Sequence, residues 1–372
     1  MLTVVAGTRP NFMKIGPIVR ELARRGSPFR LVHTGQHFDA GMSDVFFRDL
    51  GIPAPHARFE VSGSTHGEQT ASILVGIERD LVAHRPFAVL VVGDVTSTFA
   101  AALAASKLLI PVVHVEAGLR SRDFTMPEEI NRVLTDQLSD LLLIPSEDAR
   151  PNLLAEGIDA SRIVFVGNVM IDSLHATLAS PTDALSRFGV REKQFGLLTL
   201  HRPANVDDPA ELLRTLEAVE VLAAENPLLF PVHPRTRAKL DALRGKTKAL
   251  DDANVRIVEP LGHKDFVTLM ARAKFVATDS GGIQEETTAL QVPCLTMREG
   301  TERPITVDEG TNVIVGRDLD RLRAALRNIH QGSHKKGRIP HGWDGHAAKR
   351  IVDALEQFQE GTPKPKKDGA RA

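Results

Sequence analysis

The chain has 372 residues, more than one typical hydrophobic core accommodates, and this length suits two domains of ordinary size. Its 46 Lys and Arg residues balance 47 Asp and Glu residues, so the composition gives no basic surface of the kind that binds nucleic acid. Cys294 is the only cysteine, which excludes an internal disulfide and a cysteine-rich metal site.

Apolar runs alternate with helical patterns along the whole chain. The first run follows no basic region or cleavage site, and none is long enough to span a bilayer, so we expect a cytoplasmic protein that does not enter membranes. The expected strands are residues 2–6, 29–33, 88–92, 112–115, 141–144, 163–166, 195–200, 228–232, 255–258, 275–278, 294–297 and 312–315. The expected helices include residues 15–24, 65–84, 96–108, 128–138, 210–223 and 265–271.

Nearly continuous apolar strands separated by helices are typical of parallel sheets covered on both faces. We therefore predict an α/β fold with two doubly wound, Rossmann-like domains, residues 1–168 and 169–344. The strand rhythm is lost over residues 169–186, where the connection between domains is expected. Ligands of such sheets bind at the carboxyl ends of the strands, so the two domains are expected to face each other across a cleft. Residues 361–372, rich in proline and lysine, are expected to be a disordered tail.

Residues 278–286, Thr-Asp-Ser-Gly-Gly-Ile-Gln-Glu-Glu, join an expected strand to an expected helix. Ser280 is a good N-cap, and Gly281 and Gly282 bring no side chain to the place where unpaired helical amides point at an anion. Glu285 and Glu286 would repel a phosphate there unless one of them accepts hydrogen bonds from a ribose diol. The segment therefore favours a nucleoside diphosphate, with a capped surface helix as the alternative.

Two cations follow the first expected strand, in residues 7–14, Gly-Thr-Arg-Pro-Asn-Phe-Met-Lys. Arg9 and Lys14 beside a glycine turn, at the mouth of a sheet, suit an anionic substrate. A helix entry in which Arg9 pairs with a surface acid would use the same residues.

Three carboxylates are candidates for acid and base chemistry. Asp94 and Glu116 follow two expected strands of the first domain, whose carboxyl ends share one edge. Partial burial there can raise a carboxyl pKa toward neutrality. Glu128 comes next, after Pro127 at a helix start. Singly, Asp94 has an alternative as an N-cap and Glu128 as a first-turn acid, but their shared edge favours catalysis.

His201 closes the strand at residues 195–200 and can bridge a phosphate or carry a proton. His233 closes the next strand, so His201 is not unique, and Arg303 adds a cation after a later strand. No His, Asp and Glu residues have metal-ligand spacing, and no dinucleotide-binding or Walker glycine motif follows a strand. We expect no metal and no cofactor.

Taken in order, these motifs match one family. The chain resembles the non-hydrolysing UDP-N-acetylglucosamine 2-epimerases, whose two-domain fold is called GT-B. The resemblance covers nearly the whole chain. The matching segments are residues 7–10, 93–94, 114–120, 127–129, 201–202, 278–286 and 301–304.

The resemblance implies a UDP-sugar substrate and a role for each candidate residue. Glu286 would bind the ribose, Phe266 would lie by the uracil, and Asp94, Glu116 and Glu128 would form the acid/base set. The diphosphate region would be bound by Arg9, Lys14, His201, Ser280, Gly281, Gly282 and Arg303. Family members eliminate UDP to give a 2-acetamidoglucal and add it back with the opposite configuration at C2. The resemblance also implies a homodimer and a C-terminal helix, residues 345–360, that returns to the first domain.

Three positions depart from the best-known members of the family. Asn11 stands where many have Glu, Asp39 replaces a second Gln, and Pro203 replaces an Arg. The last two changes put regulation by a second UDP-sugar in doubt. Relatives with similar loops act on modified UDP-amino-sugars such as a diacetamido glucuronate, so the sugar stays open. The motifs also leave open a GT-B glycosyltransferase, a hydrolysing epimerase and a nucleotide-sugar sensor without turnover.

Overall fold

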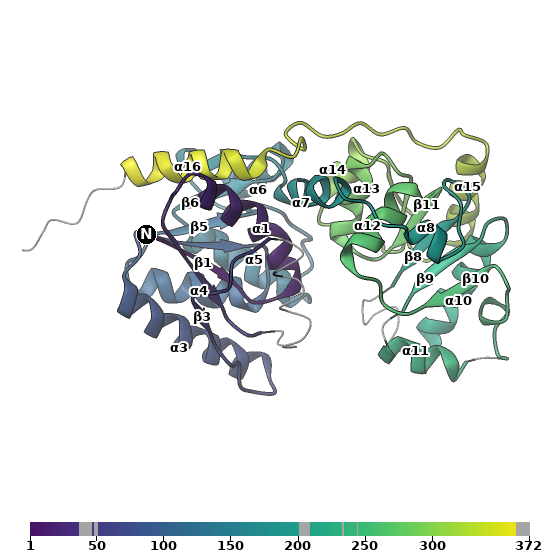
Figure 1. The fold of residues 1–372 in the computed structure, drawn as a ribbon, viewed down its shortest axis with the longest axis horizontal. Coiled ribbons are helices and arrows are strands. Elements are labelled where there is room, and N and C mark those ends of the chain that lie inside the picture. Colours follow the sequence, from purple (N-terminus) through teal and green to yellow (C-terminus); the bar gives the residue numbers. More distant parts are fainter. Residues whose placement is uncertain (37–46, 48–50, 201–208, 233, 244, 362–372) are drawn as a thin grey trace, which may run out of the picture. The chain divides into compact units, whose positions relative to one another are not determined.

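The computed structural model describes residues 1–36, 47, 51–200, 209–232, 234–243 and 245–361. The chain divides into two compact units, one built from residues 1–173 and the segment from 344 onward, the other from residues 174–343. Each unit holds one parallel sheet with helices around it (Figure 1). The predicted α/β class with two Rossmann-like sheets is therefore confirmed. The division falls inside helix α7 (Val169–Leu178), shortly after the boundary predicted at residue 168.

Unit 1 contains a seven-stranded parallel sheet in the order β3-β2-β1-β4-β5-β6-β7. Its strands are β1 (Leu2–Ala6), β2 (Phe29–His33), β3 (Ala57–Arg58), β4 (Ala88–Val92), β5 (Val112–Val115), β6 (Leu141–Ile144) and β7 (Ile163–Phe165). All were expected except β3, which has only two residues and so carries no periodic signal. The order reverses between β1 and β4, the kind of switch point beside which α/β sheets bind ligands.

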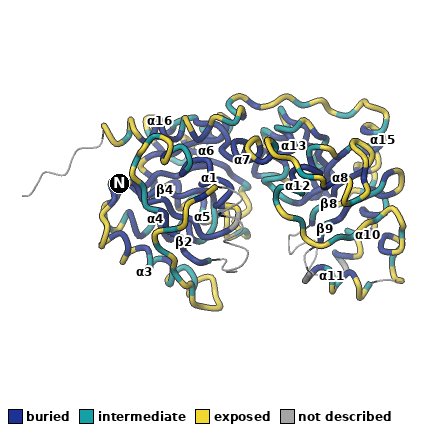
Figure 2. Tube along the Cα trace, in the orientation of Figure 1, coloured by how far each residue is buried: buried dark blue, intermediate teal, exposed yellow. Residues whose placement is uncertain are grey.

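Alternate residues of the unit 1 strands pack on opposite faces of the sheet. On β1, Val4 lies in one apolar cluster and Val5 in another, and both are buried. The first cluster includes apolar residues of α1, and the second those of α3 and α4. Figure 2 shows the strands as buried and the helices as partly exposed. The helices are α1 (Arg9–Arg24), α3 (His66–His84), α4 (Thr96–Lys107), α5 (Pro127–Leu138), α6 (Arg150–Ala155) and α16 (Ala347–Gly361).

Helix α16 lies beside α1, although more than three hundred residues separate them in sequence (Figure 1). Ile351, Val352 and Leu355 complete the apolar cluster to which α1 contributes. Asp172 of α7 accepts hydrogen bonds from the Ala347 and Ala348 amides, at 3.1 and 2.8 Å, and so satisfies the start of α16. This carboxylate fixes where α16 begins.

Unit 2 contains a six-stranded parallel sheet in the order β10-β9-β8-β11-β12-β13. Its strands are β8 (Gly196–Thr199), β9 (Leu228–Pro231), β10 (Val255–Val258), β11 (Phe275–Thr278), β12 (Cys294–Thr296) and β13 (Asn312–Ile314). Its helices are α8 (Ala184–Arg187), α10 (Pro209–Ala223), α11 (Pro234–Asp241), α12 (His263–Arg272), α13 (Gly281–Ala289), α14 (Pro304–Asp308) and α15 (Leu319–His330). Of all helices in the described ranges, none has the length and apolar character that crossing a membrane requires.

Candidate functional site

The turn between β1 and α1 is shorter than the sequence suggested. Helix α1 begins at Arg9, not near residue 15, because Thr8 takes the N-cap position and a proline suits the first turn. Asn11 accepts hydrogen bonds from the Gly7 and Thr8 amides through Oδ1, and its Nδ2 donates to the Val92 carbonyl at 3.1 Å. Asn11 therefore joins the start of α1 to the end of β4. The side chain of Arg9 lies outside the described residues.

Lys14 and Glu116 form a buried salt bridge at the carboxyl end of the unit 1 sheet. Glu116 has a φ of +73°, a left-handed conformation that is strained for a glutamate and is found disproportionately at functional sites. A Cβ on Gly93 would lie 2.7 Å from Lys14 Nζ, so only glycine leaves room for this pair. Lys14 and Glu116, two of the predicted site residues, are therefore in contact. They lie beside the Gly93 turn, which leads to Asp94, a third predicted site residue.

Asp94 is held in place mainly by helix α5. Arg132 forms ion pairs with both Asp94 and Glu129, and Asn131 donates a hydrogen bond to the Asp94 carbonyl at 3.0 Å. Glu129 is buried, and its carboxylate also accepts two backbone amides, whereas the neighbouring Glu128 is exposed. The predicted acid Glu128 therefore lies on the outer side of the first turn of α5.

Unit 1 also contains a chain of charged groups that is buried except at Glu156, and no role was assigned to its members from the sequence, although His114 and Arg120 lie in the matching segment 114–120. His114 of β5 contacts Asp136 of α5 at 2.6 Å and the Gly93 carbonyl at 2.8 Å. Arg120 pairs with the other Asp136 oxygen at 2.7 Å and with Glu156 at 2.5 Å. Burial alone would raise the pKa of the Asp136 carboxyl, but His114 and Arg120 outweigh it and hold that pKa below its usual range.

The spacing of polar residues along α5 is the sequence pattern that could have indicated these residues. Glu129, Arg132 and Asp136 recur at intervals of three and four, while Ile130 and Leu134 of the same helix are exposed. A helix that turns its polar side to the protein interior contradicts the usual pattern. This inversion indicates that α5 supports a polar site.

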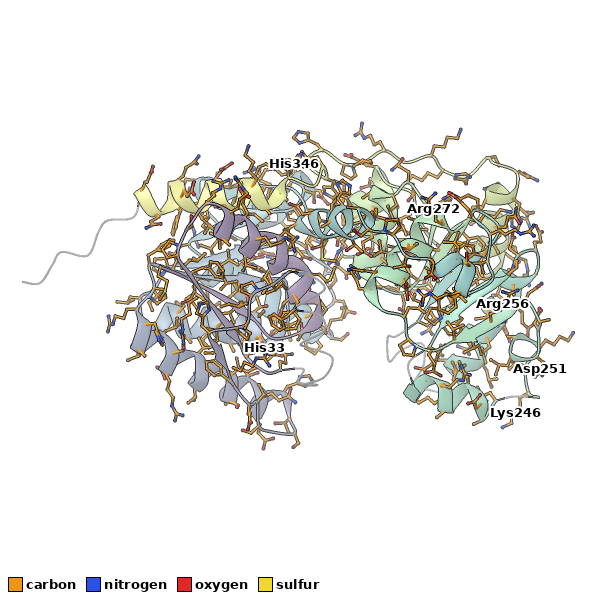
Figure 3. The ribbon with its side chains drawn as sticks, viewed as in Figure 1. His33, Lys246, Asp251, Arg256, Arg272 and His346 are labelled. Atoms are coloured by element: carbon orange, nitrogen blue, oxygen red, sulfur yellow. The ribbon has the colours of Figure 1, made fainter. Side chains whose placement is uncertain are left out.

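His33 ends β2 in the same unit and is labelled in Figure 3. Its Nδ1 accepts a hydrogen bond from the Gly35 amide at 2.8 Å, so that nitrogen carries no proton. Burial and the nearby Arg58 lower the pKa of His33 to about 4. His33 is therefore a neutral core histidine. Among the residues that the structure describes, no group of three or more His, Cys, Asp or Glu residues could hold a metal ion.

In unit 2, the glycine turn opens helix α13 as predicted. Ser280 takes the N-cap position, but its side chain makes no capping hydrogen bond. Its backbone amide instead donates to Thr278 Oγ1 at 3.0 Å. Gly281 and Gly282 form the first turn, whose amides have no acceptor within the helix. The end of β11 therefore presents amide donors on residues that have no side chains of their own.

Arg303 lies directly against this turn. A Cβ on Gly281 would be 2.6 Å from Arg303 Nη1, so any larger residue would push the guanidinium aside. Arg303 also pairs with Glu285 at 2.9 Å and with Glu302 at 2.8 Å. Both acids hold the guanidinium in position and offset part of its charge.

Glu286 follows Glu285 on α13 and is also buried. Burial, with a smaller contribution from the Glu285 charge, raises the pKa of Glu286 to about 8. The sequence alone suggested an ionised glutamate here. In the protein as described, Glu286 is largely protonated at neutral pH and can donate one hydrogen bond as well as accept.

Gln284 joins the glycine turn to the loop that carries Arg303, a role that the sequence did not reveal. Its Nε2 donates to the Ser280 carbonyl at 3.2 Å, and its Oε1 accepts from Thr301 at 2.7 Å and Asn312 at 3.1 Å. Two further residues of unit 2, Phe266 and His201, were predicted to belong to the site. Phe266 lies half-buried in the first turn of α12, and His201 lies outside the described residues.

Comparison with known proteins identifies the family. The sequence profile of a family described as UDP-N-acetylglucosamine 2-epimerase matches residues 20–356. The chain belongs to this family. The family and fold predicted from the sequence are thereby confirmed. The UDP-N-acetylglucosamine 2-epimerase of Methanocaldococcus jannaschii is 40% identical over 364 residues, which cover 95% of this chain and 98% of that protein.

A second relative is equally similar, and a crystal structure matches nearly the whole chain. The UDP-2,3-diacetamido-2,3-dideoxy-D-glucuronate 2-epimerase of Pseudomonas aeruginosa is 41% identical over 96% of this chain and 99% of that protein. The crystal structure of the M. jannaschii epimerase in complex with UDP-GlcNAc and UDP matches with a TM-score of 0.86 and 39% identity, covering 96% of this chain and 99% of that one.

Proposed function

We propose that this protein catalyses the reversible C2 epimerisation of a UDP-N-acetylhexosamine, converting UDP-N-acetylglucosamine to UDP-N-acetylmannosamine. The reaction proceeds by anti elimination of UDP to a 2-acetamidoglucal and by re-addition of UDP. The observation that carries this proposal is the pairing of Asp94 and Glu116 with cations at the carboxyl edge of the unit 1 sheet, in a chain of this family.

Unit 2 supplies groups suited to the UDP portion. The amides of Gly281 and Gly282 suit the diphosphate, and Arg303 adds a cation beside them. The Glu286 carboxyl suits the ribose hydroxyls, and Phe266 suits the uracil. Stabilising UDP as a leaving group is the main requirement for breaking the C1–O bond, and positioned donors do this well.

Unit 1 supplies groups suited to the chemistry at C2. The hydrogen on this carbon is only weakly acidic, so its removal requires a positioned base on one face and an acid on the other when the hydrogen returns. Asp94, Glu116 and Glu128 are the candidates, with His201 as a further one. Lys14 keeps Glu116 in a fixed geometry, which favours efficient proton transfer.

A second candidate substrate class is a modified UDP-amino-sugar such as a diacetamido glucuronate. The P. aeruginosa relative that acts on a diacetamido glucuronate is as similar to this chain as the M. jannaschii enzyme. An epimerase of such a modified UDP-amino-sugar would use the same UDP groups and the same acids. Assembly as a homodimer in the cytoplasm is part of the same proposal.

Incubation with each purified UDP-sugar alone, followed by NMR, tests the proposal. An epimer with UDP still attached is the expected product, and turnover in deuterated water is expected to place deuterium at C2. Free sugar would indicate a hydrolase, absence of change without an acceptor would favour a glycosyltransferase, and binding without turnover would indicate a sensor. Retention of the original hydrogen at C2 would contradict elimination and re-addition.

Amide variants test the acids. Asp94→Asn, Glu116→Gln and Glu128→Gln should each reduce kcat by roughly 100- to 10,000-fold, with a much smaller effect on KM. Glu78→Gln, which changes an exposed acid on α3, is the matched control and should retain activity. Near-normal rates in all three site variants would show that the acids lie elsewhere.

A further inference from the structure

His114 lies at the centre of unit 1 and is fully buried. Both of its ring nitrogens have a partner: Nδ1 meets the Asp136 carboxylate at 2.6 Å, and Nε2 meets the Gly93 carbonyl at 2.8 Å. The ring therefore spans from helix α5 to the end of β4. No role was assigned to it from the sequence, although it lies in the matching segment 114–120.

The chemistry of these partners decides which ring nitrogens carry a proton. A backbone carbonyl only accepts hydrogen bonds, so Nε2 must be the donor to Gly93. The Asp136 carboxylate already accepts from the Gly118 amide at 3.1 Å and from Arg120 at 2.7 Å, which is the environment of an ionised acid. Nδ1 must then be the donor to Asp136. A histidine that donates from both nitrogens is an imidazolium.

The surrounding charges suit this form. Asp136 contacts the ring directly, and Arg120 pairs with Asp136. Glu156 ends the chain through two contacts with Arg120, at 2.8 and 2.5 Å. With a cationic His114, the chain of four groups holds two positive and two negative charges. A neutral His114 would leave the chain with one excess negative charge, and Asp136, whose side chain is fully buried, would lose one of its two cationic partners.

We propose that His114 is a doubly protonated positioning residue that holds the Gly93 carbonyl and thereby sets the place of Asp94. Gly93 has a φ of +66°, and its carbonyl meets the buried His114 ring at 2.8 Å. Asp94 follows at once and is held a second time by Asn131 and a third time by Arg132. The residue acts on the reaction only through Asp94, so this part of the inference rests on the proposed function.

NMR of the protein labelled with ¹⁵N in its histidines tests the protonation state without any activity. At neutral pH, we expect one ring among the 14 histidines with slowly exchanging protons on both nitrogens, and its signals should vanish in His114→Gln. His33 is the internal reference, because its Nδ1 accepts a hydrogen bond and should appear unprotonated. A spectrum in which every buried ring lacks one proton would overturn the proposal, even if the variant failed to fold.

Kinetics of the same variant test the positioning role. Glutamine carries both of its donors on one nitrogen and so cannot span from Asp136 to Gly93 as the two ring nitrogens do. The Gly93 turn should therefore shift, and a misplaced catalytic group costs on the order of 100-fold in kcat. KM and the Kd for UDP should stay near the parent values, because His114 contacts none of the groups assigned to UDP. His84→Gln, which alters an exposed histidine beside Asp80, is the matched control. Unchanged kcat in His114→Gln, or an equal loss of UDP affinity, would overturn the positioning role. If the parent protein epimerises no UDP-sugar, the proposed function fails while the NMR result still decides the imidazolium.

Discussion

The raised pKa of Glu286 predicts that UDP binding releases a proton. The free carboxyl has a pKa of about 8, because it is buried next to the charge of Glu285. A ribose diol donates two hydrogen bonds, and donors of this kind favour the ionised form of a carboxyl. Bound UDP should therefore lower the pKa of Glu286, and the affinity for UDP should rise with pH.

The size of this effect follows from linkage between proton and ligand binding. If the bound carboxyl titrates well below pH 7, the Kd for UDP should fall about fivefold between pH 7 and pH 8, and about 0.9 proton should leave at pH 7 for a free pKa of about 8. Above pH 8 the dependence should level off, because the free protein is then also ionised. The opposite sign, a weaker affinity at higher pH, is excluded for a group whose pKa falls on binding.

Isothermal titration calorimetry with UDP, in buffers of different ionisation enthalpy, measures both the Kd and the released proton. The variant Glu286→Gln has no carboxyl to titrate, so it should bind more weakly and lose the change between pH 7 and pH 8. A Kd that is the same at both pH values in the parent protein, with no buffer-dependent heat, would refute the ribose assignment of Glu286. A pH dependence that survives in Glu286→Gln would place the titrating group elsewhere.

Three further predictions concern single residues. Gly281→Ala should displace Arg303, whose Nη1 would lie 2.6 Å from the added Cβ. Calorimetry should then show weaker UDP binding, while circular dichroism should show an unchanged fold. Full affinity for UDP would contradict the role assigned to this turn. Asp172→Ala leaves buried α16 amides, including that of Ala348, without an acceptor, which should cost about 1–3 kcal/mol in urea denaturation; an unchanged midpoint would argue against this contact. Cys294 is buried, and burial raises the pKa of its thiol to about 11, so a thiol reagent at pH 8 should react only after denaturation; rapid reaction of the native protein would contradict its burial.

The fold was largely predictable because its strands are buried on both faces. A strand such as Val112–Val115 reads as an uninterrupted apolar run, and the glycine turns that follow such runs mark the strand ends. Helix starts were less predictable. Arg9 begins α1 because Thr8 and Asn11 form the cap from polar side chains, which apolar periodicity does not report.

The candidate site was predictable only where a motif stood at a strand end. Asp94 and Glu116 were found in this way, but Arg132 and His114 were not, because their roles depend on partners far away in sequence. Burial also changes chemistry that sequence alone cannot assign. Glu286 reads as an ordinary acid in the sequence, and only its surroundings raise its pKa to about 8.

The place of α16 has a consequence for how the chain is made. The apolar cluster around α1 includes Ile351, Val352 and Leu355, which are synthesised only after all of residues 174–343. The intervening unit, residues 174–343, occupies on the order of 10 to 30 seconds of elongation. During that interval the first unit exposes the apolar surface of α1 that α16 later covers. A nascent chain of this protein is therefore most vulnerable to aggregation and to chaperone capture through the α1 surface of unit 1, and truncation before α16 makes that state permanent.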